Sequence, residues 1–87
     1  MGSRSVQRIA AEIARCEQAQ RFWELAGDLE LSGYYRGASE AYSHILFDSP
    51  MPAEEIQRFL TAARQQQMLQ LAHSYQEAAS GTATVGD

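Results

Sequence analysis

The apolar residues in the first part of the chain recur every three or four positions. They are Val6, Ile9, Ile13 and Cys16. This spacing places them on one face of an α-helix. The segment 5–31 contains no proline, its only glycine is Gly27, and Ala, Glu, Gln, Arg and Leu dominate it. These residues favour helix, so we predict a long helix that begins with Ser5 as its N-cap.

Further along this segment, the apolar stripe changes direction. Its members are now Phe22, Leu25, Ala26 and Leu29. At about 100° per residue, this second stripe is displaced by nearly half a turn from the first. Either the helix breaks near 17–20, or one continuous helix presents its two halves to different neighbours. No helix-breaking residue lies there, so the continuous helix is the preferred interpretation.

Gly33 is predicted to end this long helix, because glycine tolerates the left-handed conformation that commonly closes a helix. A second helix then follows at about 35–47. Its predicted core positions are Ala38, Ala41, Tyr42, Ile45 and Leu46. A turn this short requires the two helices to lie antiparallel, and the two small alanines allow them to approach closely.

The segment 48–52, Asp-Ser-Pro-Met-Pro, interrupts the helical pattern. Proline cannot continue a helix, although it suits the first turn of a new one. Glu54 and Glu55 place negative charge at the positive end of the helix that follows, which we predict at about 52–79. The apolar residues of this helix change face after three glutamines. They are Ile56, Phe59, Leu60 and Ala63, and then Met68, Leu71, Ala72, Tyr75 and Ala79.

These elements predict an all-α fold with a single helical domain at 5–79. In this architecture a helical hairpin at about 22–48 follows a long N-terminal helix and is capped by the long C-terminal helix. Residues 1–4 are expected to be flexible, and the small, polar segment 80–87 to be a disordered tail. A domain of this size buries only about 60–65% of its unfolded surface, and such domains often gain stability from a partner.

The charge balance bears on the class of partner. The chain has 11 acidic residues and 7 basic residues, all of them arginine, and a formal net charge of −4. An acidic chain repels the phosphate backbone that supplies most nucleic-acid affinity, so direct nucleic-acid binding is disfavoured. A rival hypothesis is a DNA-binding regulator that uses the arginine stripe opposite the first apolar stripe, which consists of Arg4, Arg8 and Arg15.

The chain shows no signal for export or for a membrane. Cys16 is the only cysteine, so no internal disulfide can form, which fits a reducing compartment. The N-terminus lacks the apolar centre of a signal peptide, and no apolar run reaches the length of a membrane span. We expect a cytoplasmic protein without a membrane partner.

No constellation of residues indicates catalysis. His44 and His73 lie on different predicted helices, and no ligand pair has the close spacing of a zinc site. Glu24 and Asp28 share a helical face, but a catalytic pair also needs a cleft and a raised pKa. Cys16 lies on an apolar stripe without a neighbouring base. The sequence therefore predicts a protein that is not an enzyme and that uses neither a metal nor a cofactor.

The central residues resemble one tetratricopeptide repeat, a helix-turn-helix unit of about 34 residues. The match covers roughly 19–52 and rests on Ala26, Gly33, Ala38, Tyr42, Leu46 and Pro50. It departs at Leu29, where Tyr is usual, and at Ile45, where Ala is usual. Because a lone repeat cannot bury its own face, the resemblance implies that the C-terminal helix caps it.

The stretch 28–38 also resembles the centre of small bacterial transcriptional regulators of the PerC and ANR type. The matching residues are Leu29, Glu30, Gly33, Tyr34 and Ala38. Tyr42 stands where such proteins tend to have Trp, and no Cys follows Arg64. This resemblance implies regulation of transcription by contact with another protein.

In size and single-repeat design, the chain also resembles the co-chaperones of bacterial type III secretion, which implies a needle subunit as partner.

We therefore expect a bacterial adaptor or regulator that binds another, unidentified protein through apolar helical faces. We also predict a homodimer formed by the helical extensions. The residues predicted to contact the partner are Trp23, Tyr34, Tyr35, Ile13, Met68, Leu71 and Tyr75, with Arg4, Arg8 and Arg15 as an electrostatic docking surface. Trp23 lies off both apolar stripes, and Trp and Tyr are favoured at the centres of protein interfaces.

Overall fold

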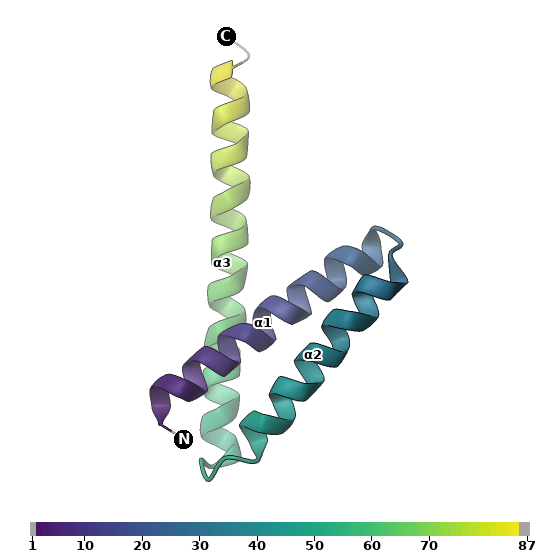
Figure 1. Ribbon diagram of the computed structural model, residues 1–87. Helices are drawn as coiled ribbons and strands as arrows, with labels where there is room; N and C mark the ends of the chain where they lie inside the picture. The colour runs from purple at the N-terminus through teal and green to yellow at the C-terminus, as the bar shows by residue number, and fades with distance from the viewer. Residues whose placement is uncertain (1, 86–87) are drawn as a thin grey trace.

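The computed structural model describes the backbone of residues 2–85 and the side chains of residues 2–79. Within this range the chain forms three helices and no strand, which confirms the predicted all-α class (Figure 1). The helices are α1 (Ser3–Leu25), α2 (Leu29–Phe47) and α3 (Ala53–Val85). None of the described helices combines the length and the apolar character needed to cross a membrane.

The turn between α1 and α2 lies at residues 26–28. Gly27 has a φ of 83°, in the left-handed region that favours glycine. Asp28 then caps α2, because its carboxylate accepts a hydrogen bond of 3.0 Å from the backbone N–H of Leu31. The prediction that Gly33 closes the first helix is therefore wrong. A left-handed glycine followed by an acidic N-cap ends α1 earlier, and Gly33 lies inside α2.

α1 runs without interruption through residues 17–20, which confirms the continuous helix at that point. It ends at Leu25, however, earlier than the predicted end at residue 31. Its first residue is Ser3, and Gly2 occupies the N-cap position without a side-chain hydrogen bond, so the predicted cap on Ser5 is wrong. Residues 3 and 4 belong to the helix, whereas Met1 lies outside the described residues.

The hydrophobic core lies at one end of the molecule, where the start of α1, the end of α2 and the start of α3 come together (Figure 1). Its buried residues are Val6, Ala10, Ile13, Leu46, Ile56 and Leu60. Tyr42 and Phe59 are half-buried against this cluster. The first apolar stripe of α1 and the first apolar stripe of α3 are thus confirmed as core-facing.

The second apolar stripe of the first helix lies at the surface. Phe22, Leu25 and Leu29 are 59%, 90% and 76% exposed, because the helix ends at Leu25 and leaves them at the tip of the hairpin. Two residues predicted for the core of the second helix are also exposed, namely Ala41 and Ile45, the latter by 49%. Both lie on the side of α2 away from the Tyr42–Leu46 face, and α3 barely contacts α2 there.

α3 packs against α1 through its first part and then projects away from the hairpin (Figure 1). We call residues 68–85 of α3 the overhang. The resulting molecule is open and elongated, with extents of 56 × 29 × 16 Å. α3 reaches Val85, so its predicted end at residue 79 is wrong. The helix thus includes residues 80–85 of the predicted tail, and residues 86–87 lie outside the described residues.

Candidate functional site

A cleft of about 540 Å³ lies where the overhang diverges from the hairpin. All three helices contribute to it, and its size is within the usual range of binding pockets. We call it the aromatic cleft. Its lining residues are Glu12, Arg15, Cys16, Gln18, Ala19, Phe22, Trp23, Tyr35, Gln67, Leu71 and Tyr75.

Aromatic rings form the hairpin side of this cleft. Phe22 and Trp23 meet edge to face near the end of α1, with their ring centres 4.9 Å apart. On α2, Tyr34 and Tyr35 form a second edge-to-face pair at 5.1 Å. Aromatic pairs favour this geometry, so each ring supports its neighbour. Trp23 and Tyr35 are half-buried, and they line the cleft in a fixed arrangement before anything binds.

The overhang forms the opposite side of the cleft. Leu71 and Tyr75 are four residues apart and therefore lie on the same face of α3. Leu71 is half-buried, whereas Tyr75 is 71% exposed. Met68, which is 57% exposed, continues the apolar face beside them. No part of the described chain covers this face, although it has the composition of a face that packs against a neighbour.

Cys16 forms part of the apolar floor of the cleft. Its side chain is buried. Burial raises the pKa of the thiol, and this effect outweighs the opposing influence of the neighbouring Arg15. The thiol therefore stays protonated at neutral pH, which agrees with a packing role rather than a nucleophilic one.

A two-pronged ion pair joins α1 to α3 just before the overhang begins. The Nε and Nη2 atoms of Arg64 donate hydrogen bonds of 2.9 Å each to the two carboxylate oxygens of Glu17. The bond to Glu17 raises the pKa of the guanidinium, which stays charged at any pH at which the protein is studied. This fork-to-fork geometry restricts how the two helices can pivot. It links α1 to α3 close to the point where the overhang leaves the hairpin.

The structure brings together four of the seven residues predicted to contact a partner. These four line the aromatic cleft, and they are Trp23, Tyr35, Leu71 and Tyr75. Met68 lies on the same overhang beside the cleft, and Tyr34 is 67% exposed on α2 but outside the lining. The prediction for Ile13 is wrong, because this side chain is 1% exposed and packs in the core.

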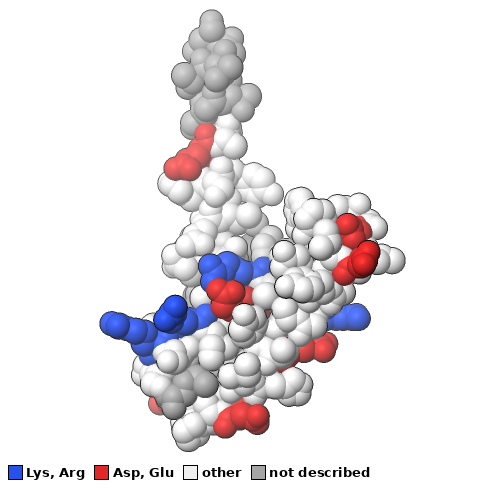
Figure 2. All heavy atoms as spheres, viewed as in Figure 1, with Lys and Arg blue, Asp and Glu red and all other residues white. Residues whose placement is uncertain are grey.

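The predicted arginine stripe is only partly available as a docking surface. Arg4 and Arg8 are exposed, and Figure 2 shows basic side chains gathered over the N-terminal part of α1. Arg15 instead forms an ion pair with Glu12, which lies on the preceding turn of the helix. Arg15 also lines the aromatic cleft. Its charge is therefore partly neutralised within the chain.

Sequence reasoning missed two components of the site. It placed Phe22 and Cys16 on apolar stripes of the first helix but named neither as a binding residue, and it placed the turn at Gly33 rather than at residues 26–28. The pair Gly27-Asp28, a glycine followed by a good N-cap residue, is the signal that could have corrected this. The ion pair between Glu17 and Arg64 joins residues far apart in the sequence, and no local pattern predicts it.

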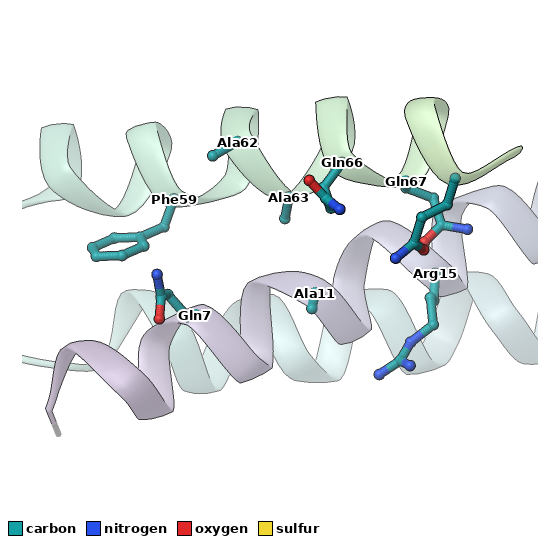
Figure 3. A pocket seen from close by; sticks show the side chains of 9 residues that line it. Gln7, Ala11, Arg15, Phe59, Ala62, Ala63, Gln66 and Gln67 are labelled. Atoms are coloured by element: carbon teal, nitrogen blue, oxygen red, sulfur yellow. The ribbon is translucent and has the colours of Figure 1, made fainter. Parts of the chain in front are cut away.

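A second, smaller hollow of about 340 Å³ follows the seam between α1 and α3. Figure 3 shows Phe59 at one end, above Gln7, and a set of glutamines from α3 at the other end, above Arg15. Small side chains, Ala11 and Ala63, line its middle. Arg15 also lines the aromatic cleft, so the two hollows are adjacent.

Within the described residues, no group of three or more His, Cys, Asp or Glu side chains is placed to hold a metal ion. Comparison of the chain with family models, with curated proteins and with solved structures finds no match.

Proposed function

We propose that this protein is an interaction module that binds an amphipathic helix of another protein in the aromatic cleft. One observation carries the proposal. Aromatic and aliphatic side chains from three helices converge on a cleft that the described chain leaves open. A helix laid with its apolar face in a hydrophobic groove is a recurring mode of protein recognition.

The lining of the cleft indicates the character of the bound helix. Trp23, Tyr35 and Leu71 offer a desolvated centre, and Trp and Tyr are the residue types that most often dominate binding energy. Glu12 and Arg15 lie at the polar edge, already paired with each other. The bound helix would therefore present apolar side chains spaced three and four residues apart, with few charges on that face.

The wider role that we propose is that of a non-enzymatic bacterial adaptor or regulator. Residues 28–38, which resemble the centre of PerC- and ANR-type regulators, span the N-cap and first half of α2 and include the cleft residue Tyr35. This overlap supports a partner that acts in transcription, so that the protein would work by contact with that partner rather than by contact with DNA.

The experiment that tests this proposal compares two leucines of the overhang. Leu71 lines the cleft, whereas Leu69 lies about 200° around the helix and is 66% exposed. The partner is first captured from the native host with the immobilised full-length protein and identified by mass spectrometry. Its affinity for each variant is then measured by calorimetry. We expect Leu71→Ala to weaken binding roughly tenfold or more, and Leu69→Ala to leave it unchanged.

Trp23→Ala provides the second arm of the experiment. It should weaken binding at least as much as Leu71→Ala, while the helical circular dichroism stays at the wild-type level. Equal affinities of the Leu69→Ala and Leu71→Ala proteins, both folded, would place the partner elsewhere and refute the assignment of the cleft.

A further inference from the structure

The chain exposes more surface than a compact protein of its mass. It exposes 6438 Å², whereas a folded monomer of 9.7 kDa exposes roughly 5,100 Å². Its radius of gyration is 15.9 Å, against roughly 12 Å for a compact domain of this length. The excess arises because the overhang and the tip of the hairpin diverge from the common core (Figure 1).

This excess has the size of a dimer interface. It amounts to roughly 1,300 Å² per chain, or about 2,600 Å² for two chains. Obligate homodimers bury roughly 2,000–5,000 Å² in total. Two copies that covered each other's excess surface would therefore form an interface of ordinary size.

The overhang has the chemistry that the aromatic cleft requires of a bound helix. Apart from Leu69 and Ala78, its described apolar residues occupy an arc of about 100° on the helix. They are Met68, Leu71, Ala72, Tyr75 and Ala79. From residue 68 to residue 79 the sequence contains one carboxylate, Glu77, and no Lys or Arg. The side chains of His73 and Glu77 contact each other at 3.1 Å, outside this arc.

We infer that the aromatic cleft of one copy binds the overhang of a second copy, and that the second copy does the same in return. This inference rests on the proposed function, since it names a helix that the cleft binds. In such a two-fold dimer the two overhangs lie antiparallel, and each is held between its counterpart and the aromatic wall that contains Trp23 and Tyr35.

Three features of the structure support this occupant. The cleft is bounded by the overhang itself, so a second overhang that enters it also covers the apolar arc of the first. Because each overhang carries only one carboxylate, bringing two together adds little repulsion, although each chain has a net charge of −4. An isolated helix is also marginal in water, and the described side chains of the overhang from residue 72 to residue 79 are exposed.

The test is sedimentation analysis of the full-length chain over a wide range of concentration. We expect the wild type to sediment at twice the monomer mass of 9.7 kDa and to dissociate on dilution. Leu71→Ala and Met68→Glu should each raise the dissociation constant roughly tenfold or more. Leu69→Ala should sediment like the wild type. Met68 and Leu69 are 57% and 66% exposed, so neither change threatens the fold of the monomer.

Trp23 provides an independent signal, because it is the only tryptophan and it lines the cleft. Its fluorescence emission should move to shorter wavelength as the wild-type concentration rises through the dissociation constant. The same shift should occur in the Leu69→Ala protein, whereas in the Met68→Glu protein it should require a concentration roughly tenfold or more higher. Circular dichroism of each variant at low concentration checks that its monomer is folded.

Two results would overturn the inference. One is a wild type that stays monomeric at the highest concentration. The other is a dimer that Leu71→Ala and Met68→Glu leave as stable as the wild type, since its interface would then lie elsewhere. If the monomeric wild type still bound its partner through Leu71, the proposed function would stand without the dimer. If the dimer formed as described but Leu71→Ala kept full affinity for the captured partner, the dimer would stand without the proposed function.

Discussion

The core of this protein is small, so single side chains carry much of its stability. Ile13 is 1% exposed. It belongs to the same buried cluster as Leu46 of α2 and Ile56 of α3. Truncating such a residue removes its transfer free energy and leaves a cavity that the surroundings only partly refill. An isoleucine elsewhere in the chain, Ile45, is 49% exposed and provides the matched control.

We expect Ile13→Ala to lower the free energy of unfolding by about 2–5 kcal/mol. Ile45→Ala should lower it by about 1 kcal/mol or less, because the side chain is already largely in water. Urea denaturation followed by circular dichroism measures both values. Similar losses in the two variants would show that the core is not at the end of the molecule where Ile13 lies.

At this scale, the sequence predicts which residues are apolar and periodic, but not which of them remain uncovered. The stripe that contains Ile13 has the same pattern as the stripe that contains Leu71, and both are compatible with a core or with an interface. Burial separates them, since α2 and α3 pack on the first stripe, whereas on the second only Leu71 is half-buried and the other members are exposed. Trp23 could be identified because it fitted neither stripe.

Among the elements, the turn at residues 26–28 decides how α1 and α2 pair. Gly27 adopts a φ of 83°, where a side chain costs about 1–2 kcal/mol. Gly37 lies inside α2, where glycine is destabilising relative to alanine by roughly 0.5–1 kcal/mol. A Cβ at either position would meet no atom within 4 Å. The effect of an alanine at the two positions therefore differs only because the backbone conformation differs.

The two alanine substitutions should therefore have opposite effects. We expect Gly27→Ala to lower the melting temperature and Gly37→Ala to raise it, each by several degrees, since about 1 kcal/mol corresponds to roughly 4–8 °C in a domain of this size. Differential scanning calorimetry at one low protein concentration makes the comparison. Stabilisation by Gly27→Ala would show that the turn does not lie there.

The position of this turn could have been predicted from the residues that follow the two glycines. The preference of glycine for helix ends does not distinguish Gly27 from Gly33. Gly27 is followed directly by Asp28, a good N-cap residue, whereas Gly33 is followed by two tyrosines. The pair Gly27-Asp28 therefore favours a turn at Gly27.

For the molecule as a whole, the buried core and the proposed binding surface lie at different ends. No described side chain beyond Leu60 is buried, so the overhang contributes little to the core. A chain that ends at Gln67 should therefore keep its fold. Local sequence patterns were sufficient to predict the all-α class and the three helices. The angle between α3 and the hairpin could not be predicted in this way, because it depends on contacts between residues far apart in the sequence, such as Glu17 and Arg64.

We expect the chain that ends at Gln67 to unfold with a free energy within about 1 kcal/mol of the full-length value at low concentration. The full-length protein should melt at higher temperature as its concentration rises, because association stabilises the folded state. The shortened chain should show no such dependence. Thermal unfolding over a wide range of concentration tests both statements. A shortened chain that fails to fold would mean that the overhang belongs to the core.

The ion pair between Arg64 and Glu17 has a consequence for proteolysis. Arg64 is the last basic residue of the sequence. A protease of tryptic specificity therefore finds no site in the rest of α3, and a single cut after Arg64 would release residues 65–87 as one peptide. Because Arg64 is held in two hydrogen bonds on a helix, that cut requires local opening of α3. One cleavage would thus separate the overhang from an intact core.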